Sequence, residues 1–596
     1  MDKSNEKYTQ LLGYKPSEYQ NKIFNFVEHN VGNAVIQARA GSGKTATIIT
    51  SMKLVPKNKK CLFLAFNTSV KDEITKKLSD YNNCTIQTVH GLGFSILSTH
   101  FHDKEFNIDK TKYVTYLRQH IEDLSTATFK NPTQYTEFIN NVLELLNFAR
   151  MDLSQSVREI NRSAEKRSLQ IKFDEDKVVY SLMKWGKENI DTIDYTDMVW
   201  LPNELRIMPK SNRYDWIFND EAQDYTIAYV ELFLKCFKRG TRFISCGDEF
   251  QAINEFAGAS KTAFNKMINY PNTQIFFLPI SYRCDKAIIT EAQRYVPDIE
   301  ARPNAGTGLI KFNSKIAEIN NDDMILSRTN APLFKLYDIL INKGKPCYIK
   351  GQENDSQKLI NLINNIISSI KNEEHKNNLS PNFESDGLFP RLYLNLINKR
   401  KQLVNSGISD IDVIHSDTIQ NMYDTIHSLL ILSKNCNTVD ELINKIQKIF
   451  KDKGDGICLS TIHKAKGLES NYVHILCRSE LPNKYAKTES AIIQERNLLY
   501  VAITRAKNKL CYIDEKEFPP MKIFAQSDNN EINEFDLIET NVNKLYSNNE
   551  LIITAHQSST LTDITQHFNN LNKKVIDNKL TSNQTSKDKL LSKLLQ

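Results

Sequence analysis

The chain has 596 residues, which is too long for a single hydrophobic core and predicts about three or four domains. Hydrophobic residues make up 40% and charged residues 25%, which is ordinary for a soluble globular protein. The 77 Lys and Arg residues exceed the 71 Asp and Glu residues by only six, so charge alone permits a nucleic-acid partner but does not argue for one.

Strands and helices alternate at the start of the chain. Residues 34–37 are predicted to form a short buried strand, followed by a Gly-rich turn and a helix over 45–54. Further buried strands are predicted at 61–66 and 85–90. From about 95 to 195 the pattern becomes helical and charged.

The alternation resumes after this helical stretch and is interrupted once more. Between about 352 and 452 the sequence is again helical and rich in Lys, Asn and Ile. We therefore expect two α/β halves, each carrying a helical insertion of roughly a hundred residues. The later strands are predicted at 215–219, 243–246, 275–278, 310–312, 324–326, 346–349, 457–460, 472–476 and 510–513.

The stretch after about 516 is rich in Asn, Ser, Thr and Lys, which predicts a loosely ordered tail. Apolar residues recur in it at helical spacing and predict one amphipathic helix. That helix would either pack back onto the core or recruit a protein partner. The apolar residues are Leu561, Ile564, Phe568, Leu571 and Val575.

Ten cysteines are scattered singly along the chain and none forms a Cys-x-x-Cys pair, which argues against a zinc ribbon, an iron–sulfur cluster or a disulfide framework. The polar N-terminus lacks the apolar segment of a signal peptide, and no run approaches the roughly 18 apolar residues of a transmembrane helix. We expect no membrane partner and a cytoplasmic location, or a nuclear or viral one if the source is eukaryotic or viral.

A glycine-rich segment, residues 38–45, directly follows the first strand and precedes a helix. Its small residues let backbone N–H groups point inward, and the helix N-terminus adds positive charge. Lys44 can reach the β- and γ-phosphates of ATP, and the Thr45 hydroxyl can bind Mg²⁺. The residues expected to contact the nucleotide here are Ala38, Arg39, Ala40, Gly41, Ser42, Gly43, Lys44, Thr45 and Ala46.

Two adjacent carboxylates, Asp220 and Glu221, end a hydrophobic strand. Downstream of a phosphate loop, the first carboxylate is expected to hold Mg²⁺ and the second to activate water, whereas a lone pair of this kind is usually a solvated loop. Charge on the γ-phosphate also calls for arginines, and Arg283 and Arg505 are the candidates. Either arginine alone is more often part of a surface ion pair.

An ordered set of short segments runs through the chain. The set consists of Gln20, the phosphate loop, AFN at 65–67, TVH at 88–90, DEAQD at 220–224, GDEFQ at 247–251, SYR at 281–283, LSRTNAP at 326–332, LSTIHKAKGLE at 459–469 and NLLYVAITRAK at 497–507. In this order the segments resemble the motifs of the UvrD/Rep/PcrA helicases of superfamily 1A. The resemblance covers about residues 10–515 and is closest to the F-box DNA helicases, although no F-box is visible.

The resemblance implies roles for side chains around the nucleotide. The Gln20 amide would pair with the adenine edge, Tyr282 would stack on the adenine face, and Glu469 would lie near the ribose. Gln251 would sense the γ-phosphate and couple it to DNA. The catalytic residues implied are Lys44, Asp220, Glu221, Gln251, Arg283 and Arg505, with the two arginines reaching the γ-phosphate from the second lobe.

The same resemblance implies contacts to single-stranded DNA. Stacking of bases on aromatic side chains tolerates any base sequence and so suits a motor that steps along a strand. Phe256 stands where the family places such an aromatic, and the alternative for Phe66 is a core position. The DNA-contacting residues implied are Phe66, Asn67, His90, Phe256, Thr461 and His463.

The chain departs from this family at several positions. Asn254 and Ala257 stand where the family carries a Tyr and an Arg beside the stacking aromatic, which predicts looser coupling or lower processivity. Ser281 replaces the commoner Asn, and Ala46 stands where members often have an Arg. Arg39 either supplies a compensating charge or faces solvent.

The expected architecture is α/β, with two RecA-like P-loop NTPase lobes that contain parallel sheets and carry one helical insertion each. The predicted division is lobe 1A at 1–95 and 196–280, insertion 1B at 96–195, lobe 2A at 281–351 and 453–515, a short insertion 2B at 352–452, and the tail at 516–596. ATP would lie between the lobes.

Three functions are consistent with these motifs. The first is a monomeric DNA helicase that uses ATP and Mg²⁺, moves 3′ to 5′ on single-stranded DNA and at its junctions with duplex, and serves repair, recombination or replication. The second is a translocase that strips proteins from single strands with weak unwinding, which the altered residues beside Phe256 and the short second insertion favour. The third is an ATP-gated module of a defence or viral assembly, recruited through the tail.

Overall fold

The computed structural model describes residues 3–102, 104–129, 132–167, 169–253, 261–351, 353–368, 387–405, 409–451, 455–486 and 488–520. The chain divides into two units by its internal contacts. Unit 1 takes in Met1–Thr307 and Glu489–Thr504, and unit 2 takes in Gly308–Thr488 and Arg505–Gln596. The helix predicted around 561–575 lies outside the described residues.

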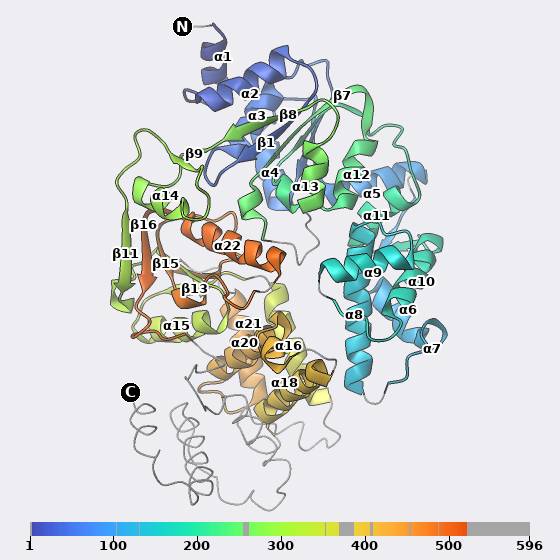
Figure 1. Cartoon of the computed structure of the whole chain (residues 1–596), viewed down its shortest axis with the longest axis vertical. Helices are drawn as coiled ribbons and strands as arrows, with labels where there is room; N and C mark the ends of the chain where they lie inside the picture. Colours follow the sequence, from blue (N-terminus) through green and yellow to red (C-terminus); the bar gives the residue numbers. More distant parts are fainter. Residues whose placement is uncertain are drawn as a thin grey trace, which may run out of the picture. The chain divides into compact units, whose positions relative to one another are not determined.

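Unit 1 is built on a six-stranded sheet in which every pair of neighbouring strands is parallel (Figure 1). The strand order is β3 (Cys84–Thr88), β2 (Cys61–Ala65), β6 (Tyr214–Asn219), β7 (Phe237–Gly247), β1 (Asn33–Ala38) and β8 (Thr273–Leu278). Its inner strands are apolar runs such as CLFLA in β2, because both of their faces are covered. The α/β class with parallel sheets is confirmed.

Helices cover both faces of this sheet. Because successive residues of a strand point to opposite faces, Val35 and Ile36 of β1 belong to different hydrophobic clusters. Ile36 packs with residues of α1–α4, and Val35 packs with residues of α5 and α11–α13. The helices named here are α1 (Lys3–Leu12), α2 (Glu18–His29), α3 (Lys44–Leu54), α4 (Thr68–Lys77), α5 (Val89–His100), α11 (Tyr195–Glu204), α12 (Ile227–Lys235) and α13 (Lys261–Ile268).

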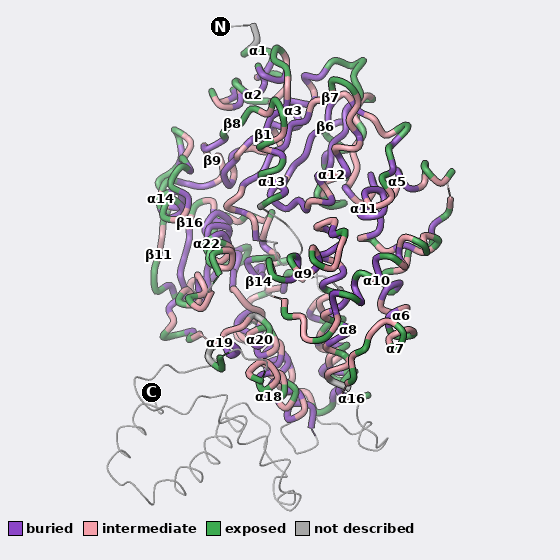
Figure 2. Tube along the Cα trace, turned by 45° about the vertical axis from the view of Figure 1, so that its right-hand side comes forward, coloured by how far each residue is buried: buried purple, intermediate pink, exposed green. Residues whose placement is uncertain are grey.

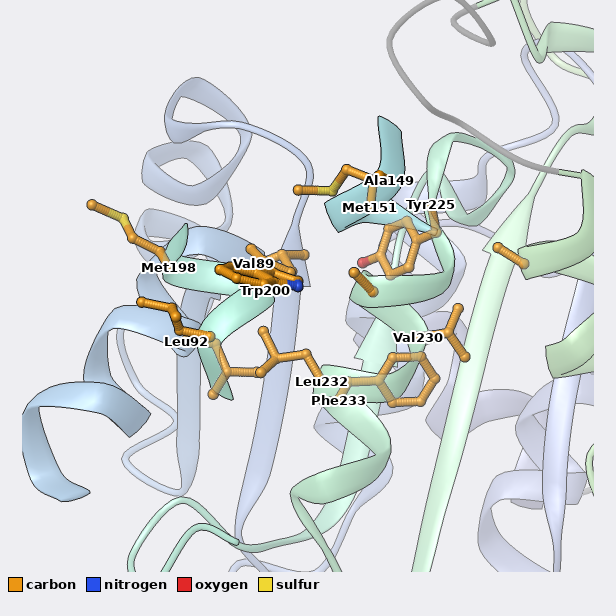
Figure 3. Packing of buried hydrophobic residues seen from close by; sticks show 14 of the residues in the cluster. Val89, Leu92, Ala149, Met151, Met198, Trp200, Tyr225, Val230, Leu232 and Phe233 are labelled. Atoms are coloured by element: carbon orange, nitrogen blue, oxygen red, sulfur yellow. The ribbon is translucent and has the colours of Figure 1, made fainter. Parts of the chain in front are cut away.

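The helical insertion of unit 1 packs into the same hydrophobic cluster as Val35 of the sheet. Figure 3 shows side chains of α5, α8, α11 and α12 meeting around Trp200, which is fully buried. The insertion is therefore packed onto the α/β core through apolar surface. Its elements are β4 (Asn107–Ile108), α6 (Lys112–Gln119), α7 (Ile121–Leu124), α8 (Pro132–Met151), α9 (Val157–Lys166), α10 (Glu175–Glu188) and β5 (Thr192–Ile193).

Four further elements belong to unit 1. These are β9 (Ile280–Ser281) paired with β10 (Glu300–Ala301), α14 (Lys286–Ala292), and α22 (Glu489–Ile503). The predicted lobe 2A begins at 281, but residues 281–307 and 489–504 group with unit 1. Hydrogen bonds explain this grouping, because Tyr282 N–H donates to the Gly41 carbonyl and the Tyr500 hydroxyl accepts from Ala40 N–H.

Unit 2 contains a second six-stranded parallel sheet (Figure 1). Its order is β11 (Leu309–Ser314), β16 (Ala506–Ile513), β15 (Ser470–Ile475), β12 (Met324–Ser327), β14 (Ile457–Thr461) and β13 (Cys347–Ile349). Figure 2 shows that strands of both sheets are buried along much of their length. The observed positions of the later strands overlap those predicted from the sequence.

The helices of unit 2 and its sheet share one hydrophobic cluster, which contains Ile325 and Leu459 from the strands and Leu396 and Leu442 from the insertion. Phe518 is also buried in this cluster, three residues beyond the predicted end of the lobe at 515. The helices are α15 (Ala331–Asn342), α16 (Glu353–Ser368), α18 (Leu388–Asn405), α19 (Asp410–Ile414), α20 (Asp417–Leu432) and α21 (Val439–Lys451).

One of the wrongly predicted element boundaries affects a candidate site residue. The strand expected over 85–90 ends at Thr88, and α5 begins at Val89. The Thr88 hydroxyl accepts a hydrogen bond from Gly91 N–H and so caps the helix, which places His90 in a first helical turn.

Among the described residues, no helix has the length and apolarity needed to cross a membrane.

Candidate nucleotide site and DNA contacts

The phosphate loop connects the end of β1 to the start of α3. Gly41 and Gly43 have φ angles of 71° and 79°, in the left-handed region that glycine adopts without strain. A Cβ atom added to Gly41 would also lie 2.6 Å from the Arg283 Cβ and 2.8 Å from the Ser281 Oγ. No side chain caps α3, so its first N–H groups have the arrangement that binds phosphate.

Mg²⁺ prefers hard oxygen ligands, and two of them converge beside this loop. The Thr45 hydroxyl donates to Asp220 Oδ2 at 2.8 Å, with Asp220 directly after β6. Burial and the neighbouring Glu221 raise the pKa of Asp220 to about 6, although Lys44 and Thr45 oppose them. One carboxylate and one hydroxyl fit Mg²⁺, which takes its remaining ligands from phosphate and water.

Lys44 and Glu221 lie beside Asp220 and form an ion pair. Lys44 Nζ lies 3.6 Å from Glu221 Oε1. Burial lowers the pKa of Lys44, but Glu221, Asp248 and Asp220 together leave it above the usual value, so the side chain is charged. Glu221 has a φ of 51°, an uncommon left-handed conformation for a residue with a side chain, of the kind that clusters at functional sites.

The GDEFQ segment places a buried carboxylate between the loop and Gln251. Gln251 Nε2 donates to Asp248 Oδ2 at 2.7 Å, and Asp248 is fully buried. Asn497 of α22 donates to the carbonyls of Glu249 and Ala252. Asp248 and Asn497 both lie in the recognised sequence motifs, but no role was predicted for either residue.

Gln20 is buried next to the loop, and its amide is already engaged. Its Nε2 donates to the Thr47 hydroxyl at 3.0 Å, and its Oε1 accepts from Ser17 N–H in a capping box at the start of α2. The ring centroids of Tyr282 and Tyr14 lie 6.4 Å apart. Tyr14 is a further aromatic for an adenine ring that the sequence reasoning did not single out; no motif marks it.

The two candidate arginines belong to different units. Arg283 lies beside Gly41 in unit 1, and its Nη1 donates to the Thr504 carbonyl at 3.1 Å. Arg505 belongs to unit 2, where its buried side chain donates to the Leu468 carbonyl at 3.0 Å. Its approach to the γ-phosphate remains a prediction.

Other residues assigned to the nucleotide from sequence are found as follows. In unit 2, Glu469 pairs with Lys507 at 2.7 Å, and its approach to the ribose remains a prediction. Ala38, Ala40 and Ser42 are buried within the loop and its strand. Arg39 is buried as well, so the solvent-facing alternative for it is wrong.

The predicted DNA contacts in unit 1 lie after parallel strands. Phe66 follows β2 and is 40% exposed, so the core alternative for it is wrong. Asn67 caps α4 by accepting from Val70 N–H. Burial lowers the pKa of His90, so this ring is neutral at pH 7, and its Nε2 lies 3.5 Å from the Tyr229 hydroxyl.

The DNA contacts predicted in unit 2 also lie at or just after the end of a parallel strand. Thr461 is the last residue of β14 and is buried, whereas His463 is exposed two residues later. Phe256 and the altered Asn254 and Ala257 lie outside the described residues.

Comparisons with known proteins point to one family. The model of the UvrD/REP helicase N-terminal domain matches residues 19–271, and that of the UvrD-like helicase C-terminal domain matches residues 456–513. The chain is similar to F-box DNA helicase protein 1 of Schizosaccharomyces pombe, with 25% identity over 80% of this chain and 55% of the relative. It is also similar to the ATP-dependent DNA helicase Rep of Buchnera aphidicola, with 22% identity over 82% of this chain and 93% of the relative.

A third relative is F-box DNA helicase 1 of Gallus gallus, which is 24% identical over 84% of this chain and 49% of its own length. The chain thus spans about half the length of the F-box relatives and nearly all of Rep.

Proposed function

Because this chain belongs to the UvrD/Rep family of ATP-dependent DNA helicases, we propose that it hydrolyses ATP at the phosphate loop of unit 1 and moves 3′ to 5′ along single-stranded DNA. The observation that carries the proposal is the placement of Thr45 and Asp220 within hydrogen-bond distance, beside the charged Lys44 and Glu221. These are the groups that phosphoryl transfer to water requires: a cation on the phosphates, oxygen ligands for Mg²⁺ and a base.

Each group then has a task in hydrolysis. Lys44 leaves its pairing with Glu221 for the β- and γ-phosphates, and Glu221 orients the attacking water and takes its proton. Thr45 and Asp220 would hold Mg²⁺, which neutralises charge on the β- and γ-phosphate oxygens when bound. Gln251, Arg283 and Arg505 are proposed to complete the site around the γ-phosphate.

Single-stranded DNA, with its junctions to duplex, is the proposed track. Support comes from Phe66 and His463, which are exposed just after buried parallel strands, one in each unit. Stacking on an aromatic is worth about 1–3 kcal/mol per base and reads no sequence, so it suits stepping. Repair, recombination or replication would be the setting, with the chain acting as a monomer.

The second candidate is a translocase that strips proteins from single strands and unwinds duplex poorly. It is favoured by Asn254 and Ala257, which replace a stacking and a cationic side chain of the family. Fewer contacts to the strand would reduce the work delivered per step.

Strand displacement on tailed duplexes tests these proposals. We expect duplex with a 3′ single-stranded tail to be unwound and duplex with a 5′ tail to remain paired, with Lys44→Ala inactive on both. Removal of a bound protein from a 3′-tailed strand, without displacement of the complementary strand, would favour the translocase. If the wild-type chain and Lys44→Ala hydrolyse ATP equally, the proposed site is wrong.

A further inference from the structure

Arg39, the second residue of the phosphate loop, is directed into the protein. Its Nε and Nη2 donate to the two carboxylate oxygens of Asp298 at 2.8 and 2.5 Å, and its Nη1 donates to the Ala38 carbonyl at 3.1 Å. Every guanidinium nitrogen therefore has a protein acceptor. Burying a guanidinium is unfavourable unless its charge is paired, so this arrangement needs its carboxylates.

A second carboxylate meets Arg39 from the GDEFQ segment. Asp248 Oδ1 lies 3.8 Å from Arg39 Nη1, and the guanidinium carbon lies 4.7 Å from the ring centroid of Phe250. Arg39 of the phosphate loop thus contacts both Asp248 and Phe250 of this short segment. The pair is shielded from water, since both side chains are almost completely buried, and an ion pair acts more strongly there than at the surface.

Asp248 in turn connects three parts of unit 1. Its Oδ2 accepts from Gln251 Nε2 at 2.7 Å and lies 3.4 Å from the Tyr500 hydroxyl on α22. The Tyr500 hydroxyl also accepts from Ala40 N–H at 2.9 Å. The phosphate loop, the GDEFQ segment and α22 are therefore linked through one buried carboxylate.

Burial raises the pKa of Asp248, whereas Lys44 and Arg39 lower it. Two cations thus favour the ionised form that accepts hydrogen bonds from its neighbours. When Lys44 turns to a bound triphosphate, Arg39 is the cation that stays with Asp248.

We propose that Arg39 is a positioning residue for ATP hydrolysis, which holds Asp248 in place and through it orients Gln251 toward the γ-phosphate. Asp298 anchors the guanidinium from the segment between α14 and β10. The inference rests on the proposed function of the site, because it assigns the way in which Gln251 is held during that reaction. Arg39 acts through protein groups and contributes no side-chain contact to the nucleotide.

The test measures kcat and KM for ATP with saturating single-stranded DNA in wild type, Arg39→Met, Gln251→Ala and the double variant. We expect Arg39→Met to lower kcat about tenfold and to change KM by less than about threefold, since an oriented group is lost while the phosphate contacts remain. In the Gln251→Ala background, Arg39→Met should lower kcat no further, because the group it positions is gone. Equal losses in both backgrounds would overturn the proposal.

Two milder variants keep the test usable if Arg39→Met does not fold. Arg39→Lys retains a cation near Asp248 and should recover part of the lost kcat. Asp298→Asn alters the 55% exposed carboxylate and should lower kcat about twofold, again only when Gln251 is present. A twofold loss that persists with Gln251→Ala would contradict the proposed route.

The control is Arg294→Met, which removes an exposed arginine of unit 1 that pairs with Glu291. Its kcat should equal that of wild type. Lys44→Ala distinguishes failure of the positioning role of Arg39 from failure of the proposed ATPase function. If wild type turns over ATP, Lys44→Ala does not, and Arg39→Met keeps full kcat, only the positioning role is wrong. If wild type hydrolyses no ATP, the proposed function is wrong.

Discussion

Charged side chains cluster around the phosphate loop. Asp220, Glu221 and Asp248 surround Lys44, and their combined field keeps the lysine protonated despite its burial. Lys44 offsets the charge of Asp220 and Glu221, and it shares Asp248 with Arg39. A triphosphate with Mg²⁺ brings new charges of both signs, so binding should redistribute these ion pairs and release Glu221 for its proposed role as base.

Replacing Gly41 by alanine should weaken nucleotide binding while leaving the fold intact. The new Cβ would lie 2.6 Å from the Arg283 Cβ, and φ at this position is 71°, so the loop has to move. We expect affinity for a fluorescent ATP analogue to fall at least about tenfold, measured by titration. Gly240→Ala is the matched control, since it has a φ of 82° with open space around the added carbon. Equal binding by the two variants would show that Gly41 is not packed this way.

Part of this site could be predicted from sequence and part could not. Lys44, Thr45 and Asp220 stand in short motifs next to strand ends, where local pattern fixes both the chemistry and the position. Tyr500 and Asp298 could not be assigned, because their partners in the phosphate loop lie 460 and 259 residues away in the chain and leave no local signal.

At the scale of elements, the position of strands followed from apolar runs, whereas their ends depended on capping. The segment TIQTVH keeps a β-like composition across Thr88, yet the threonine hydroxyl begins a helix there. The shared core of the second sheet and its helical insertion was also not predictable. Helix faces in that insertion are amphipathic, but periodicity does not say which surface covers them.

Asp424 of α20 joins the insertion to the segment that precedes α15. Its carboxylate accepts from Asn330 N–H at 2.9 Å and Ala331 N–H at 2.8 Å, and so caps that helix from another element. We expect Asp424→Ala to destabilise unit 2 by about 1–2 kcal/mol, measured by denaturant unfolding. Asp440→Ala, which removes an exposed acid in the first turn of α21, should have little effect. A similar loss in both variants would argue against the cap.

Unit 2 should lose stability in mild acid because of His427. Burial lowers the pKa of this ring from the usual value of 6.5 to about 4, so the unfolded chain binds the proton more tightly. Stability is therefore fully present above about pH 6.5 and decreases as the pH falls toward 4, by up to about 3 kcal/mol. In His427→Phe, the midpoint of thermal unfolding should change less between pH 5 and pH 7 than it does in wild type. His29→Leu, which replaces an exposed histidine, should leave this pH dependence as it is. An unchanged slope in His427→Phe would contradict this origin.

For the whole molecule, the proposed motor needs single-stranded DNA as its track. ATPase activity should therefore be stimulated more by a single-stranded oligonucleotide than by blunt duplex of the same length, because stacking side chains reach only unpaired bases. Steady-state turnover at fixed salt measures this, since affinity for the phosphate backbone falls steeply as salt rises. Equal stimulation by both DNAs would argue against single-stranded DNA as the track.

The discontinuity of unit 1 has a consequence for how the protein is made. Residues 489–504 belong to unit 1 but are synthesised only after residues 308–488 of unit 2. They include Tyr500, whose hydroxyl accepts a hydrogen bond from the Ala40 N–H. Although domains generally fold as they emerge, unit 1 can be complete only after residues 489–504 have been synthesised. We therefore expect nascent chains that stop before 489 to lack ATP turnover, so that energy use begins only when both halves of the motor exist.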